Sequence, residues 1–368
     1  MDLASIEQVT RTAARPHLHI YQPKLGGYMK KQLLLKAALA TAVSTIALGA
    51  IAAQPEPMNY EGTAGGVRYL EEGQPPVVIH PTVDRMEQFR KATKNAKPGG
   101  GGGSTELTYH GGVGGIGVET APKVYLVLWG SQWNNNDPSA EAALLESFIG
   151  NLGGSSFFNS VTQYCQGVAS GTTFCNGAGT PAGNNSGMYA GVWADNATAA
   201  PSSPRQSQIA AEAVRAAQHF GNTTAASNAS VNYIIATPTG VSPQGFKTQY
   251  CAYHSSTSSS TVGGNLAYTN LPYITDAGAS CGANFNGLGP NAGITIVSGH
   301  EMAEAATDQF PNGGWLDGSG AENGDKCAWI SSGQGASADV TMNGVSYPVQ
   351  SLWSNAFNSD KGGCVLSY

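Results

Sequence analysis

Residues 292–308 are the segment that most constrains how this chain folds. Nearly every position is small or apolar, so a helix formed here would be buried on all sides. Yet the segment carries His300, Glu301, Glu304 and Asp308, in a chain in which only 11% of the residues are charged. A buried carboxylate needs a partner or a metal ion to offset its lost hydration. The segment therefore predicts a central helix whose polar groups meet other polar groups in the interior.

The spacing within this helix predicts a type of chemistry. His300 and Glu304 are four residues apart, so they project from one face of a helix, one turn apart. Glu301 stands where the general base stands in the His-Glu-x-x-His helices of zinc peptidases, although the pattern here is His-Glu-x-x-Glu. We therefore predict a metal-dependent hydrolytic site in which His300 and Glu304 are ligands and Glu301 is the catalytic base.

Two acidic residues that follow the helix, Glu322 and Asp325, are the candidates for the third metal ligand. A zinc ion held by three protein ligands keeps its fourth position for water. Asp308, one turn beyond Glu304, is a candidate to orient Glu304 or His300 from behind. These assignments depend on the acidic residues folding back onto the helix.

The expected metal is zinc, but one imidazole and two carboxylates form an oxygen-rich set. Such a set also suits Mn²⁺ or Ca²⁺. A second histidine would favour zinc, and His254 or His110 could supply it. The simpler interpretation of each is structural, with His254 in a loop beside a cysteine and His110 next to a glycine turn.

The N-terminal part of the sequence predicts export. A positive Met-Lys-Lys and a run of small apolar residues predict a signal peptide over residues 29–53, preceded by an upstream extension, 1–28. The alternative is a membrane anchor, but about 17 apolar residues are short for a span of about 20. Residues 54–104 are predicted to be a propeptide or spacer that ends in a Gly-rich linker.

The cysteines support the same compartment, because an even number in an exported chain predicts disulfides. Six cysteines allow many pairings, and the sequence alone does not fix them. Sequence order favours pairing each cysteine with its neighbour, since short loops lose the least entropy on closing. The favoured pairs are Cys165–Cys175, Cys251–Cys281 and Cys327–Cys364.

Local patterns predict the main secondary-structure elements. The expected strands are 123–129, 231–237 and 265–274, the expected helices 137–153, 203–220 and 292–308, and a hairpin is expected around Asn343-Gly344. Strands and helices alternate irregularly, which favours an α+β fold. We expect a single disulfide-stabilised domain over residues 105–368, with a mixed sheet flanked by helices and a zincin-like active-site helix.

The composition excludes several classes of function. The net charge of −6 is spread along the chain, which argues against nucleic acid as a partner, and no membrane contact is expected after signal cleavage. There is no Gly-x-Ser-x-Gly motif for a serine hydrolase of the lipase type. An even number of paired cysteines leaves no thiol for a cysteine nucleophile.

Several short blocks of the sequence resemble the exordium-like, phosphate-induced secreted proteins. The blocks are Tyr109-His110-Gly-Gly, Leu128-Trp129-Gly130, residues 245–254, His300-Glu301, Cys327 and Cys364. The resemblance implies a bacterial relative of this family in an extracellular or cell-wall setting, without an established reaction. It also implies that His110, His254 and the helix of His300 belong to one shared site.

Two functions follow from these patterns. The leading one is a secreted zinc peptidase, a monomer that acts on a peptide or protein substrate or on cell-wall material. The alternative is a non-catalytic extracellular or cell-wall-associated protein that binds a divalent ion or a glycan. The metal content and the role of Glu301 separate the two.

Overall fold

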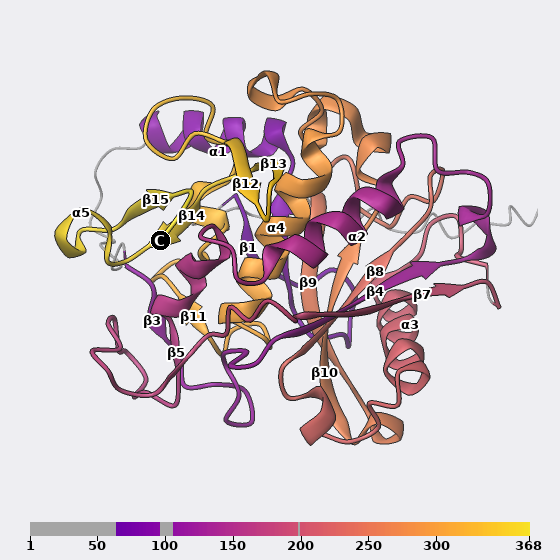
Figure 1. The fold of residues 1–368 in the computed structure, drawn as a ribbon, viewed down its shortest axis with the longest axis horizontal. Helices are drawn as coiled ribbons and strands as arrows, with labels where there is room; N and C mark the ends of the chain where they lie inside the picture. The colour runs from indigo at the N-terminus through magenta and orange to yellow at the C-terminus, as the bar shows by residue number, and fades with distance from the viewer. Residues whose placement is uncertain (1–63, 96–105, 198) are drawn as a thin grey trace, which may run out of the picture. The chain divides into compact units, whose positions relative to one another are not determined.

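A computed structural model describes residues 64–95, 106–197 and 199–368. Its centre is a seven-stranded sheet with the strand order β1-β2-β9-β10-β8-β4-β7 (Figure 1). These strands are β1 (Gly66–Arg68), β2 (Val77–Pro81), β9 (Tyr250–Ser259), β10 (Gly264–Leu271), β8 (Val231–Ala236), β4 (Lys123–Trp129) and β7 (Tyr189–Asp195). The helices are α1 (Val83–Asn95), α2 (Glu141–Leu152), α3 (Gln206–His219), α4 (Ala292–Thr307) and α5 (Phe357–Asp360).

Four small two-stranded sheets surround this centre. They pair β3 (Thr108–Tyr109) with β11 (Trp315–Leu316), β5 (Cys165–Gln166) with β6 (Thr180–Pro181), β12 (Ala338–Met342) with β13 (Val345–Val349), and β14 (Leu352–Ser354) with β15 (Gly363–Val365). The β12–β13 hairpin turns through Asn343 and Gly344, whose φ angles of 49° and 85° are those of a type I′ turn. This confirms the predicted hairpin.

The central sheet is mixed. Strands β10, β8, β4 and β7 are parallel to one another, whereas β9 is antiparallel to both β10 and β2. All six residues of β8 are buried, because a parallel strand in the middle of a sheet is covered on both faces. The predicted combination of a mixed sheet, helices and disulfides is therefore confirmed.

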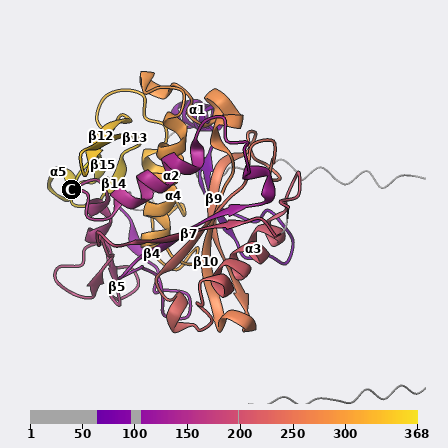
Figure 2. The ribbon, with the colours of Figure 1, turned by 45° about the vertical axis from the view of Figure 1, so that its right-hand side comes forward.

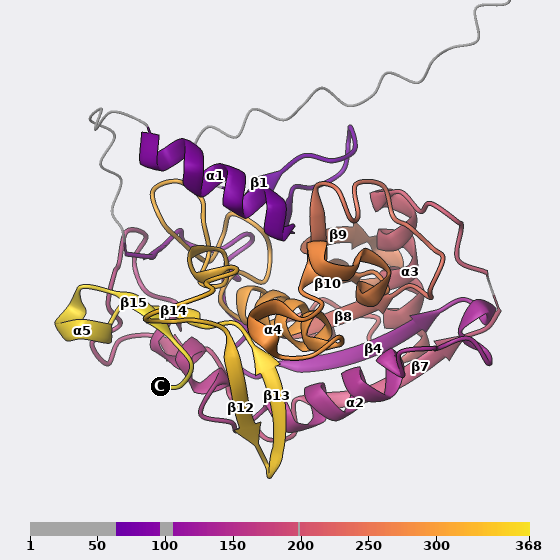
Figure 3. The ribbon, with the colours of Figure 1, turned by 90° about the horizontal axis from the view of Figure 1, so that it is seen from above.

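Helices cover both faces of the central sheet: α2 and α4 lie on one face and α3 on the other (Figure 2 and Figure 3). Successive side chains of a strand point to opposite faces. On β9, Ser255 accepts a hydrogen bond from Gln206 of α3, with a donor–acceptor distance of 3.5 Å. Its neighbour His254 points the other way, towards the acidic residues of α4. The alternation along β9 thus places His254 in the layer between the sheet and α4.

The folded unit begins earlier in the sequence than residue 105, the predicted boundary of the main domain. Strand β2 pairs with β9, and all five of its residues are buried. Residues 64–95 therefore pack as part of the domain and are not a spacer. The predicted extension 1–28, the signal peptide 29–53 and the Gly-rich linker lie outside the described residues.

Three disulfides join the pairs Cys165–Cys175, Cys251–Cys281 and Cys327–Cys364, which confirms the pairing favoured by sequence order. Disulfides of this number suggest an oxidising, extracellular compartment. Within residues 64–95, 106–197 and 199–368, no helix has the length and apolar character that crossing a membrane requires.

Candidate metal centre

Helix α4 is buried along its whole length, as its composition predicts. Small residues allow its neighbours to approach closely. A Cβ atom added to Gly293 would lie only 1.9 Å from the main-chain oxygen of Cys281, so only glycine fits there. His300, Glu301 and Glu304 have no solvent exposure. The helix therefore holds its polar side chains in the domain interior.

A loop at residues 322–325 folds back onto α4 and brings further acidic groups to it. The side-chain amide of Asn323 donates hydrogen bonds to the main-chain oxygen of Ala303 (3.0 Å) and the hydroxyl of Thr307 (2.9 Å). Gly324 passes so close to the helix that a Cβ atom there would lie 2.6 Å from Nδ1 of His300. The sequence Glu-Asn-Gly-Asp thus places two carboxylates beside the helix.

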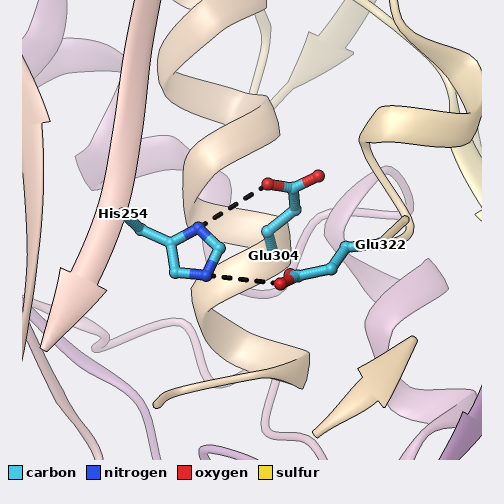
Figure 4. A group of neighbouring side chains, drawn as sticks. All are labelled: His254, Glu304 and Glu322. Carbon is cyan, nitrogen blue, oxygen red and sulfur yellow. Dashed lines mark ion pairs between the residues drawn. The ribbon is translucent and has the colours of Figure 1, made fainter. Parts of the chain in front are cut away.

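His254, Glu304 and Glu322 meet between strand β9, helix α4 and this loop (Figure 4). Nδ1 of His254 lies 3.4 Å from Oε2 of Glu301 and 3.6 Å from Oε2 of Glu304. Nε2 of the same ring lies 3.6 Å from Oε1 of Glu322. Along the same face of α4, Nε2 of His300 lies 3.1 Å from Oε1 of Glu304. The Glu304 carboxyl group therefore lies between the rings of His254 and His300.

The fourth predicted ligand, Asp325, joins the group from the loop. Its main-chain N–H donates a 2.9 Å hydrogen bond to Oε1 of Glu304. Two sets of side chains offer ligand atoms within 4.8 Å of one another: His254, Glu304 and Glu322 form one, and His300, Glu304 and Asp325 form the other. The structure therefore brings together all four predicted metal ligands and one of the two additional histidines.

The distances around His254 suit ligands that share an ion. Ligand atoms about 2.0–2.2 Å from a tetrahedral zinc lie roughly 3.3–3.6 Å from each other. The separations of 3.4 Å and 3.6 Å from Nδ1 of His254 to Glu301 and Glu304 fall in this range, whereas Glu322 lies beside the other ring nitrogen, Nε2. They are longer than the usual 2.7–3.2 Å of an N–H···O hydrogen bond.

Many polar atoms of this cluster have no hydrogen-bond partner although they are buried. They include both ring nitrogens of His254 and of His300, both carboxyl oxygens of Glu301, Oε2 of Glu304 and Oδ1 of Asp325. An unsatisfied buried polar atom costs about 1–3 kcal/mol, and more when it is charged. These buried imidazole and carboxylate atoms are of the donor types that a divalent metal ion can bind.

Burial also sets the protonation of the cluster. It raises the pKa of Glu301, Glu304, Glu322 and Asp325 well above the usual range, and the carboxyl groups raise one another further.

The two imidazoles shift in the opposite direction. Burial lowers the pKa of His254 to about 3, and His300 contributes to that shift. It lowers the pKa of His300 to about 4. Both imidazoles are therefore neutral at pH 7, so their contacts with carboxyl groups are not salt bridges. Neutral imidazole is the form that binds metal ions.

Asp308 lies at the edge of the cluster. Its carboxylate accepts hydrogen bonds from the main-chain N–H groups of residues 312–314, at 2.5–3.0 Å, and so closes the C-terminal end of α4. It also forms a side-chain hydrogen bond with Glu322. His110 is exposed, because it follows the short strand β3 and its main-chain N–H is bonded to Gly314. The prediction that His110 shares the site is therefore wrong.

The sequence did not single out His80, which lies beside the cluster. This residue is on β2, is fully buried, and stacks on His300 with 3.9 Å between ring centroids. The run Val77-Val78-Ile79 directly before it is a strand signal, but the charged residues around it obscured the pattern.

Comparisons with known proteins add no assignment: no model of a protein family, no curated protein and no solved structure matches this chain.

Proposed function

We propose that this chain is a secreted, metal-dependent hydrolase that uses zinc to cleave peptide bonds. The observation that carries the proposal is the meeting of His300, Glu301 and Glu304 on one buried helix with His254 from the sheet. Their unpartnered nitrogens and oxygens have the separations expected of ligands around an ion.

The donor set favours zinc over calcium. Calcium binds oxygen ligands, whereas zinc accepts imidazole nitrogen together with carboxylate oxygen. Each candidate group joins one imidazole to two carboxylates, a mixed set that zinc accepts. Manganese shares this preference in part and is the main competitor.

The residues divide into ligands and a base. His300, Glu304 and Asp325 form one group that would hold an ion, and His254, Glu304 and Glu322 form another. Zinc lowers the pKa of a bound water molecule to about 7. Glu301, which lies beside His254 and Glu304, would take a proton from this water molecule and pass it to the leaving amine.

The proposed setting is extracellular. Three disulfides favour an oxidising compartment, and a signal peptide is predicted over residues 29–53. The resemblance to exordium-like secreted proteins supports the cell wall as the place of action, with peptide, protein or cell-wall material as the substrate.

One observation favours a second function, in which the ion is structural and the protein is not a catalyst. His254, His300, Glu301 and Glu304 are each at most 1% exposed, and a substrate must reach the ion to be cleaved. A closed site is typical of structural zinc, whereas catalytic sites keep one position open.

One substitution separates these functions. We expect the purified chain to contain zinc and to cleave a denatured protein, and Glu301→Gln to lower kcat by at least about 100-fold with zinc retained. The matched control is Glu212→Gln, which changes a buried glutamate of α3 on the opposite face of the sheet. Bound zinc without hydrolysis in the unaltered chain would establish the structural function, and absence of metal would contradict both.

A further inference from the structure

The two oxygens of the Glu304 carboxyl group face different partners. Oε2 lies 3.6 Å from Nδ1 of His254, on the side of the sheet. Oε1 lies 3.1 Å from Nε2 of His300 and accepts the hydrogen bond from Asp325. This carboxyl group therefore lies between two sets of nitrogen and oxygen atoms. A carboxylate in such a position can bridge two metal ions.

The two candidate ligand sets share Glu304 and no other residue. One set adds His254 and Glu322, and the other adds His300 and Asp325. Two ligands of one zinc ion, each about 2.0–2.2 Å from it, cannot be more than about 4.4 Å apart. The ligand atoms of each set lie within 4.8 Å of one another, so small side-chain movements would let each set surround one ion. The two sets thus form two adjacent sites that share the carboxyl group of Glu304.

The unpartnered atoms are distributed over both sets. Both ring nitrogens of His254 lack a hydrogen-bond partner, and so do both ring nitrogens of His300. Each of these side chains is at most 1% exposed and points into the cluster. An imidazole binds an ion through one nitrogen, so an ion in only one set would leave the other histidine buried without that contact.

The charge of the cluster also favours two ions over one. Glu301, Glu304, Glu322 and Asp325 together carry four negative charges when ionised, and all are buried. Of the nearby cations, Arg68 acts on Asp325. One divalent ion offsets only two of the four charges, and Arg68 acts on Asp325 alone, whereas two divalent ions offset all four. Buried charge without compensation costs several kcal/mol.

We propose that the site on α4 holds two divalent ions bridged by Glu304, one with His254 and Glu322 and one with His300 and Asp325. This proposal rests on the proposed metal-dependent function and makes it more specific, because two ions about 3.5–4 Å apart form a known type of hydrolytic centre. In such a centre the paired ions stabilise both the attacking and the leaving atom. Glu301, beside His254, remains the base.

Metal stoichiometry tests the proposal directly. The purified chain is freed of metal with a chelator, titrated with zinc, and analysed for zinc per chain. We expect two equivalents for the unaltered chain, one for His254→Ala, one for His300→Ala, and none held tightly by Glu304→Ala. The control Glu212→Gln should keep two. Circular dichroism and intact disulfides establish that each variant is folded.

A second measurement needs no variant. In the chain loaded with Mn²⁺, two ions joined by one carboxylate give a spin-coupled electron paramagnetic resonance spectrum, whereas isolated ions give six lines. Saturation at one zinc, with an uncoupled manganese spectrum, would overturn the two-ion site and leave the proposed hydrolase intact. Binding of no zinc would overturn both proposals, so the two failures are distinguishable.

Discussion

His80 of strand β2 stacks on His300 of helix α4, with 3.9 Å between the ring centroids and 14° between the ring planes. On its other side His80 stacks on Trp329, with a centroid distance of 4.7 Å. Strand β2 therefore supplies one wall of the candidate metal centre. It also fixes the plane of an imidazole that we expect to bind metal, so β2 contributes to the geometry of the cluster on α4.

Removal of this wall should weaken both the fold and the site. We expect His80→Ala to lower the free energy of unfolding by about 2–3 kcal/mol, because it leaves a cavity between two buried rings. Without the stacked ring of His80, the His300 imidazole is no longer held in one orientation, so we expect zinc affinity to fall about 10-fold. Urea unfolding and zinc titration measure the two effects. His80→Phe keeps a ring in the stack and should restore most of the affinity; if it does not, a nitrogen of His80 is itself a ligand.

The loop that carries Asp325 depends on a glycine. A Cβ atom at position 324 would lie 2.6 Å from Nδ1 of His300 and 2.9 Å from Oε1 of Glu304. We therefore expect Gly324→Ala to push the loop away from α4 and to reduce zinc affinity at least 10-fold. Gly187→Ala is the matched control, since nothing lies within 4 Å of its added Cβ atom. Equal zinc affinity in the two variants would contradict this account of the loop.

Sequence patterns predicted the elements whose signals are local. The helix of residues 292–308 is found as α4, Ala292–Thr307, and the apolar run 123–129 is found as β4. The disulfide pairs were predictable because closing a short loop costs the least entropy. The four candidate ligands were also expected to be neighbours, because two of them lie on one turn of a helix and two on a loop that follows it.

Long-range pairing was not predictable in the same way. Strand β9, Tyr250–Ser259, is rich in serine and reads as a loop, but it lies between β2 and β10 and is held by hydrogen bonds on both edges. Its position decides that His254 meets α4. Likewise β2 is a buried strand only because β9 pairs with it. Such contacts depend on the order of the strands in the sheet, which local sequence patterns do not predict.

The disulfides should contribute to stability according to the loops that they close. Cys251–Cys281 spans 30 residues and ties the start of β9 to the segment before α4, whereas Cys165–Cys175 spans 10. In the chain-entropy relation, we expect a loss of about 3.6 kcal/mol for the first pair and about 2.7 kcal/mol for the second. Double Cys→Ser variants of each pair, compared by urea unfolding, test this order. A larger loss for the shorter loop would show that local packing, not loop length, dominates.

The last prediction concerns pH. In the metal-free chain, burial holds the pKa of Glu301, Glu304, Glu322 and Asp325 well above the usual range. A raised carboxyl pKa means that the folded state keeps protons that the unfolded state has lost, so stability falls as pH rises above about 4.5.

The pKa values of His254 and His300 are lowered to about 3 and about 4. These two groups make stability rise with pH, but only below pH 6.5, where the unfolded imidazoles bind protons that the folded ones do not.

Above pH 6.5 the cluster therefore affects stability through its carboxyl groups alone. Zinc binding displaces their protons, so zinc should stabilise the chain more at pH 8 than at pH 6.5. Thermal unfolding with excess zinc and with chelator, at both pH values, measures the difference in Tm. The variant Glu212→Gln should show the same pH dependence of the zinc effect, because its carboxyl group lies across the sheet. A zinc-induced shift in Tm that is equal at the two pH values would mean that the buried carboxyl groups do not bind the ion.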